Sequence, residues 1–150
     1  MNQTMTKSVD FNKYTEFVDA VTSEASTDFL ALSNRLVELD EKGANIERLL
    51  TAGVGINAEG GEFLEIIKKM IFQGKPFNED NRHHMIVELG DIMWYVAQAC
   101  MALGVTIDEV IAGNVTKLEK RYPGGSFDVY YSENRDRKST RLNSSHSSVS

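Results

Sequence analysis

The amino-acid sequence predicts an all-α protein: a bundle of four to five helices that oligomerises through its helix faces and ends in a disordered C-terminal tail. Apolar residues recur at steps of three and four through most of the 150 residues, which is the helical repeat. Only two prolines, Pro76 and Pro123, interrupt the chain, and proline is the strongest helix breaker. No alternation of apolar and polar residues typical of a strand occurs before Phe127.

Two helices are predicted in the N-terminal part of the chain. The first has an amphipathic stripe, and the second begins near Asp28, has an apolar face of its own and stops before Gly43. The residues of the first stripe are Phe11, Tyr14, Phe17, Val18 and Val21, and those of the second face are Phe29, Leu32, Leu36 and Leu39.

A third helix is predicted from about Asn45 to Gln73, with Gly74 and Pro76 as its stop signal. Four glycines fall inside it, at positions 53, 55, 60 and 61. Each glycine costs a helix roughly 1 kcal/mol against alanine. Either the helix breaks near residues 53–57, or another group approaches its backbone closely.

A fourth and a fifth helix are predicted from apolar faces and from start and stop signals. The fourth runs from about Glu79 to Leu103 and ends at Gly104, and Cys100 on its apolar face is expected to be a buried core residue. Thr106 and Glu109 have the spacing of a capping box, which predicts the start of a fifth helix. That helix ends before Pro123.

Composition separates the tail from one domain over residues 1–136. Six of the last twelve residues are serine and only two are large and apolar, so residues 137–150 are predicted to be disordered. This segment resembles translated sequencing-adapter read-through, and we expect it to be non-native.

The formal net charge of −6 disfavours nonspecific nucleic-acid binding, which needs many cationic phosphate contacts. A single cysteine excludes a disulfide framework. Neither a signal peptide nor an uncharged apolar stretch long enough to span a bilayer is recognisable, so we expect a cytoplasmic protein.

Four carboxylates are the most informative feature of the sequence. Glu59 and Glu62 are three residues apart on the third helix, and Glu88 and Asp91 repeat that spacing on the fourth, so each pair shares one helix face. Both pairs stand among apolar residues, where unpaired charges are costly. A divalent cation would resolve the conflict, and an all-oxygen ligand set suits magnesium, with manganese as a substitute.

These acids have two other interpretations. Each pair alone is typical of a solvated acidic face, but two pairs on consecutive helices with apolar flanks favour a cation site. A di-iron bundle needs Glu-x-x-His on two helices, and neither His83 nor His84 stands three residues after a glutamate.

The neighbours of the acids leave alternatives open. Lys69 falls near the Glu62 face and suits phosphate neutralisation, or is an ordinary exposed lysine. Tyr95 returns to the face of Glu88 and suits contact with a nucleotide, or is a half-buried structural tyrosine. Trp94 is expected in the core or an interface.

Three segments together resemble the MazG-like all-α nucleoside triphosphate pyrophosphohydrolases. The segments are Gly55–Lys69 with its E-x-x-E motif, Glu88–Tyr95 with its E-x-x-D motif, and Asn114–Pro123. The resemblance covers roughly residues 45–136. It implies hydrolysis between the α- and β-phosphates, in dimers or dimers of dimers whose active sites receive residues from more than one chain.

By position, the resemblance implies metal ligation by Glu59, Glu62, Glu88 and Asp91, with Glu65 assisting the metal or orienting water. It implies phosphate or nucleotide contacts for Lys68, Lys69, Asn114, Lys117 and Arg121, and sugar or base contact for Tyr95. The expected function is magnesium-dependent removal of selected (deoxy)nucleoside triphosphates, giving monophosphate and pyrophosphate. The alternatives are a non-catalytic helical module that binds nucleotide or protein, and a triphosphatase that releases single phosphates.

Overall fold

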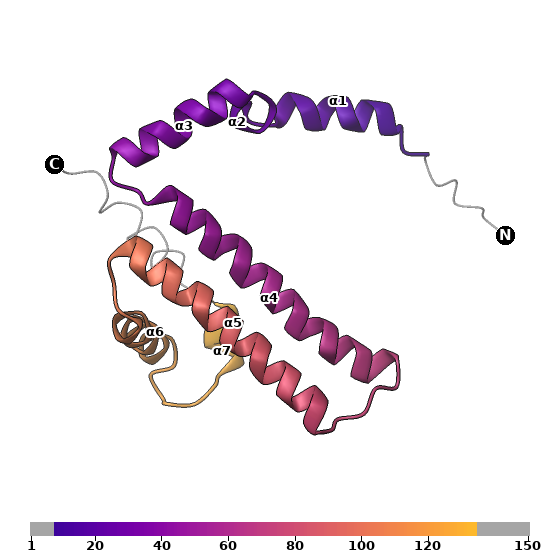
Figure 1. Cartoon of the computed structure of the whole chain (residues 1–150), viewed down its shortest axis with the longest axis vertical. Coiled ribbons are helices and arrows are strands. Elements are labelled where there is room, and N and C mark those ends of the chain that lie inside the picture. The colour runs from indigo at the N-terminus through magenta and orange to yellow at the C-terminus, as the bar shows by residue number, and fades with distance from the viewer. Residues whose placement is uncertain (1–7, 135–150) are drawn as a thin grey trace. The chain divides into compact units, whose positions relative to one another are not determined.

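The computed structural model describes residues 8–134, and these residues form seven helices and no strand. The all-α prediction is therefore confirmed. The predicted tail at 137–150 lies outside the described residues. The helices are α1 (Phe11–Val21), α2 (Glu24–Thr27), α3 (Phe29–Glu41), α4 (Ile46–Phe72), α5 (Glu79–Leu103), α6 (Ile107–Arg121) and α7 (Val129–Glu133) (Figure 1).

The five predicted helices are α1, α3, α4, α5 and α6, and the short helices α2 and α7 were not anticipated. The described residues divide into two compact units, one up to Leu103 with α1–α5 and one from Gly104 with α6 and α7.

Side-chain caps explain where the helices begin. The carboxylate of Asp28 accepts a hydrogen bond of 2.7 Å from the backbone N–H of Ala31, and Asn45 caps α4 in the same way. Thr106 and Glu109 form the predicted capping box, each side chain bonding to the other residue's backbone N–H. Such caps satisfy backbone donors that the first helical turn leaves unpaired. The predicted starts of α3, α4 and α6 follow from them.

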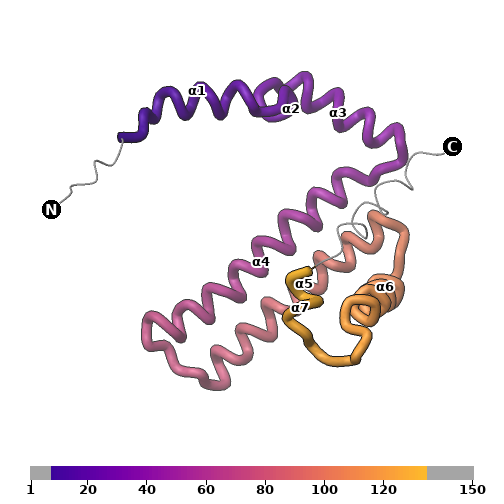
Figure 2. Tube along the Cα trace, turned by 180° about the vertical axis from the view of Figure 1, so that it is seen from behind, coloured from indigo at the N-terminus to yellow at the C-terminus, as the bar shows by residue number. Residues whose placement is uncertain are grey.

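Helices α4 and α5 form an antiparallel hairpin that organises the first unit. They lie side by side in both views (Figures 1 and 2). The turn begins at Gly74, whose positive φ of 67° suits glycine. Asn78 then caps α5 through a bond of 3.0 Å from the N–H of Asn81. The amide of Asn81 donates to the carbonyl of Pro76 at 2.6 Å, which ties the start of α5 to the turn.

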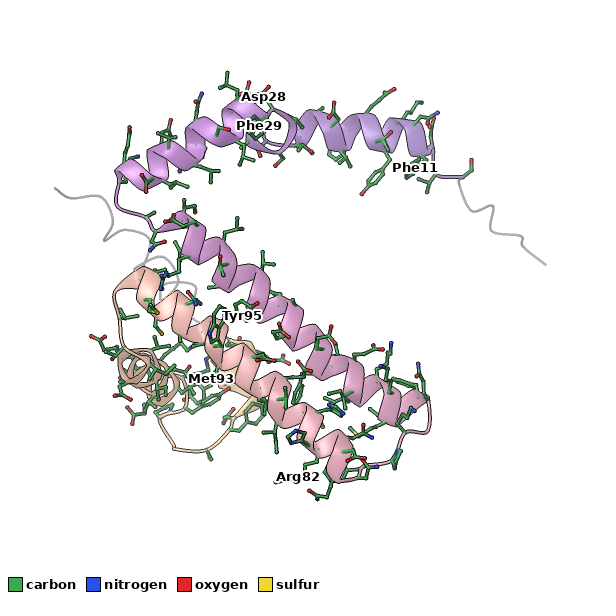
Figure 3. The ribbon with its side chains drawn as sticks, viewed as in Figure 1. Phe11, Asp28, Phe29, Arg82, Met93 and Tyr95 are labelled. Atoms are coloured by element: carbon green, nitrogen blue, oxygen red, sulfur yellow. The ribbon has the colours of Figure 1, made fainter. Side chains whose placement is uncertain are left out.

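The glycines of α4 do not break the helix, because α4 runs unbroken from Ile46 to Phe72. The other explanation of these glycines, a group that approaches the helix backbone closely, holds at Gly55. This residue is buried, and a Cβ placed there would lie 2.1 Å from ring carbons of Tyr95. Tyr95 projects from α5 toward α4 (Figure 3). The sequence also suggests that a facing helix or a ligand phosphate comes close to Gly60 and Gly61. No described group outside the local helix lies within 4 Å of a Cβ at either residue, so the approach of a phosphate stays a prediction.

The described residues bury little apolar surface. Ala52 and Cys100 are the buried hydrophobic side chains, which confirms the core position of Cys100. Large apolar residues on several helices are exposed, including Trp94 at 56%. Trp94 is therefore not a core residue, and its ring packs edge-on against Tyr95 with centroids 4.8 Å apart. A folded domain normally buries most such surface.

Helix α5 also meets the length and composition of a membrane-spanning helix, with 25 residues and a mean hydropathy of 1.3 over its most apolar window. Its middle carries Glu88 and Asp91, and carboxylates are costly in lipid. A helix that packs in a bundle can have the same composition, so this finding by itself assigns no membrane role.

Candidate metal and nucleotide site

The α4–α5 hairpin brings three of the four predicted metal ligands together. Carboxylate oxygens of Glu59, Glu88 and Asp91 all lie within 4.8 Å of one another. Glu59 comes from α4 and the other two from α5. Glu59 and Glu88 are half-buried, and Asp91 is exposed. One cation can therefore contact all three carboxylates after small side-chain rotations, with Asp91 on the side open to solvent.

Glu62, the fourth predicted ligand, lies outside this group of three. It is exposed and lines a hollow that Glu88 also lines. Its place as a ligand remains a prediction of the E-x-x-E spacing. The structure places it one helical turn along α4 from Glu59, on the same face.

The electrostatics of the cluster fit a bound cation. The pKa of Glu59 is raised above its usual value, first because its surroundings desolvate the carboxylate and then because Asp91, Glu88 and Glu62 repel its charge. A hydrogen bond with Glu88 acts in the same direction. Like charges this close destabilise one another, and a divalent cation removes the repulsion. The all-oxygen donor set fits a hard divalent ion.

The raised pKa of Glu59 predicts how the metal-free protein responds to pH. A folded-state pKa above the unfolded value stabilises the fold below pH about 4.5, and that contribution is lost as pH rises through the folded pKa. In EDTA, Glu59→Gln should therefore raise the melting temperature at pH 7 and flatten the decline of the melting temperature as pH rises from about 4.5 to 7. Thermal melts over this range test it, with Glu16→Gln on exposed α1 as control. A lower melting temperature for Glu59→Gln would show that the charge does not oppose folding.

Glu65, the acid predicted to assist the metal or to orient water, has two lysine partners. It forms ion pairs with Lys68 and with Lys69, the latter at 3.4 Å. The hydrogen bond from Lys68 is the main reason that the pKa of Glu65 is lowered. Glu65 therefore stays ionised, which suits it to orient a water molecule better than to take a proton from it. Lys68 and Lys69, both half-exposed, are paired with this carboxylate, and a ligand phosphate would have to compete with it for them.

A hollow of about 450 Å³ opens beside the acidic cluster at the turn of the hairpin. It contains four predicted site residues, Glu62, Glu65, Lys69 and Glu88, and several residues for which the sequence predicted no role. Its lining is Glu62, Glu65, Ile66, Lys69, Lys75, Pro76, Asn78, Asp80, Asn81, His84 and Glu88. One signal was available for His84, which stands four residues before Glu88 and so shares its helix face. The turn residues carried no comparable signal.

The other predicted nucleotide contacts lie in the second unit. Asn114, Lys117 and Arg121 are spaced by three and four residues on α6 and so share one helix face. Asn114 and Lys117 are exposed, and Arg121 is half-buried. This face remains a predicted contact surface. Tyr95, in the first unit, packs on Gly55, which fits its structural interpretation and leaves its nucleotide contact a prediction.

Comparison with known proteins identifies the family. The MazG nucleotide pyrophosphohydrolase domain matches residues 49–126, which include all of α5 and α6 and most of α4. The Gene 37 protein of Mycobacterium phage L5 is 35% identical over 82 residues, covering 54% of this chain and 72% of that protein. No solved structure matches. The matched region holds all three carboxylates of the cluster, and the chain belongs to the MazG nucleotide pyrophosphohydrolase family.

Proposed function

We propose that this protein hydrolyses (deoxy)nucleoside triphosphates to the monophosphate and pyrophosphate with magnesium as cofactor, in the cytoplasm, to remove or limit selected nucleotides. The observation that carries the proposal is the group formed by Glu59, Glu88 and Asp91 across the α4–α5 hairpin of a MazG-family chain. Magnesium is the preferred ion because all three donors are carboxylates and the group lies open to water and substrate on one side, and magnesium usually keeps several waters and binds substrate phosphates. Manganese is a possible substitute.

Each residue of the site has its own role in the proposed reaction. Glu59, Glu88, Asp91 and, from the E-x-x-E pattern, Glu62 hold the cation. When bound, magnesium neutralises phosphate charge and makes the α-phosphorus easier to attack. The ionised Glu65 accepts a hydrogen bond from the attacking water and orients it. Lys68 and Lys69 turn toward the phosphates and stabilise charge that develops on them.

Product identity tests this function directly. The full chain is incubated with magnesium and a panel of ribo- and deoxynucleoside triphosphates, and the products are separated by anion-exchange chromatography. Equal amounts of monophosphate and pyrophosphate are expected from at least one nucleotide. Diphosphate with inorganic phosphate would instead identify a triphosphatase. Binding of nucleotide without turnover would identify a non-catalytic module.

We also propose that the protein works as a homodimer or a dimer of dimers. The buried hydrophobic side chains of the described residues are Ala52 and Cys100 alone, while apolar residues of α1, α4 and α5 are exposed. Leu50, Val54 and Leu64, each more than 60% exposed, lie along α4. An isolated chain with so little core would not be stable, and a second copy offers the same apolar surfaces for mutual burial.

One chain has a mass of 16.8 kDa. Light scattering coupled to size-exclusion chromatography at micromolar concentration should give at least twice this mass. A folded monomer under these conditions would contradict the assembly. It would leave the proposed reaction untouched.

A further inference from the structure

The lysine, arginine and histidine side chains of the α4–α5 hairpin lie mostly near one end of it. On α4 no lysine, arginine or histidine occurs between Arg48 and Lys68, and on α5 none follows His84. Near the turn, in contrast, stand Lys68, Lys69, Lys75, Arg82, His83 and His84. At the end of the hairpin away from the turn, the guanidinium of Arg48 already donates a hydrogen bond to the sulfur of Met101, at 3.2 Å. The two sides of the acidic cluster therefore differ in charge.

The hollow at the turn joins the acidic cluster through a shared residue. Glu88 belongs to the group of three carboxylates and also lines the hollow. On α4, Lys69 lies seven residues beyond Glu62, about 10 Å along the helix axis and on the same face. Its side chain leans back along α4, as its ion pair with Glu65 shows. A ligand centred on the cluster can thus extend into the hollow.

Two side chains that line the hollow, those of Lys75 and His84, are available to bind an anion. Lys75 has no carboxylate partner within 4.0 Å among residues 8–134. His84 is exposed, and its described ring contact is with His83, at a centroid distance of 6.2 Å. Asn81 and Asn78 are already used by the turn, which holds this wall of the hollow in place. Lys75 and His84 can therefore bind phosphate oxygens without breaking an ion pair.

The opposite side of the cluster has a different chemistry. Tyr95 stands one helical turn after Asp91 and packs over Gly55, with Trp94 edge-on against it. Ile56, next to Gly55, is half-buried. Aromatic and apolar surface of this kind suits a nucleoside and offers nothing to a phosphate chain.

We propose that the hollow is the subsite for the β- and γ-phosphates, and that Lys75 and His84 bind the pyrophosphate that leaves. The triphosphate then lies along the hairpin with its γ-phosphate at the turn and its nucleoside toward Tyr95. Water oxygen forms a bond to the α-phosphorus, the bond from that phosphorus to the bridging oxygen breaks, and pyrophosphate departs with the electron pair. The proton of the water passes to solvent. This inference rests on the proposed function.

The acids in the hollow define the form in which pyrophosphate binds. Glu62, Glu65, Asp80 and Glu88 outnumber the two lysines of the lining, so a bare pyrophosphate anion would be repelled. The magnesium complex of pyrophosphate carries less negative charge and can contact both the acids and the side chains of Lys75 and His84. Binding should therefore require magnesium.

The test compares Lys75→Met and His84→Asn with matched controls outside the hollow, Lys42→Met at the end of α3 and His83→Asn beside His84. Calorimetric titration of each full-length protein, in magnesium, uses pyrophosphate and separately the four deoxynucleoside monophosphates. Each hollow variant should bind pyrophosphate about tenfold more weakly, as expected for loss of one charge-assisted hydrogen bond. The affinity for monophosphate should not change, and both controls should behave as wild type.

Three results would overturn the subsite. The first is unchanged pyrophosphate affinity in both hollow variants, and the second is an equal loss of affinity for both ligands. The third is a loss of monophosphate binding alone, which would show that the substrate lies in the opposite direction along the hairpin. The proposed function fails separately. If the wild-type protein turns over no triphosphate but the variants lose pyrophosphate binding, the subsite stands and the reaction is wrong. If turnover is normal but the variants bind pyrophosphate as wild type does, the reaction stands and the subsite is wrong.

Discussion

Asp91→Asn should lower the rate of magnesium-dependent triphosphate hydrolysis by on the order of 10²- to 10³-fold, the loss seen when one preorganised electrostatic contact is removed. Asparagine keeps the shape of the side chain and removes the charge that helps Glu59 and Glu88 hold a cation. Because Asp91 is exposed, the fold should be unaffected. Initial rates of pyrophosphate release, at a magnesium concentration that just saturates the wild-type protein, measure the effect.

The control for this change is Asp19→Asn, an exposed carboxylate on α1 that should leave the rate unchanged. Part of the loss in Asp91→Asn should be recovered at higher magnesium concentration, since weaker metal binding is its cause. Glu62→Ala extends the test to the fourth predicted ligand, where the E-x-x-E pattern predicts a comparable loss. Full activity in Asp91→Asn would remove the acidic cluster from the mechanism.

Gly55→Ala should destabilise the protein by about 1–3 kcal/mol, the usual cost of overpacking. The added Cβ would lie 2.1 Å from the Tyr95 ring, so the ring or the whole of α5 must shift. A shift of α5 also moves Glu88 and Asp91 away from Glu59, so activity should fall together with the melting temperature. Thermal melts and initial rates on the same preparation measure both.

Gly53→Ala is the matched control, since it lies two residues away on the same helix and its Cβ would meet no described group within 4 Å. It should stabilise the protein by about 0.5–1 kcal/mol, because alanine costs the helix less backbone entropy. The double variant Gly55→Ala/Tyr95→Ala should lose less stability than the sum of its two single changes. Equal melting temperatures for Gly53→Ala and Gly55→Ala would show that the close approach does not constrain the hairpin.

The helices were predictable because their signals are local. Caps such as Asp28 and Asn45 act within the next three residues. The stop signals at Gly43, Gly74 and Gly104 coincide with positive φ angles of 87°, 67° and 66°. Glycine adopts this conformation with little strain. The short helices α2 and α7 were missed because four or five residues are too few for a periodic pattern to emerge.

The site was predictable only in part. Spacing alone places Glu59 with Glu62 and Glu88 with Asp91, because residues three apart share a helix face. It does not say which members of the two pairs meet. In the structure Glu59 joins Glu88 and Asp91, while Glu62 faces the hollow. The lengthwise alignment of two antiparallel helices depends on contacts such as Gly55 against Tyr95, which are far apart in sequence.

The sequence by itself therefore determined the all-α class, the helix ends and the four acids on two helix faces, all through interactions between residues at most four positions apart. Only the tertiary structure decided that three carboxylates converge, that Gly55 admits the ring of Tyr95, and that Lys75 and His84 share a hollow with Glu88. These features depend on how α4 and α5 pack. Packing depends on the shapes of side chains about 40 residues apart, and that information is absent from any local pattern.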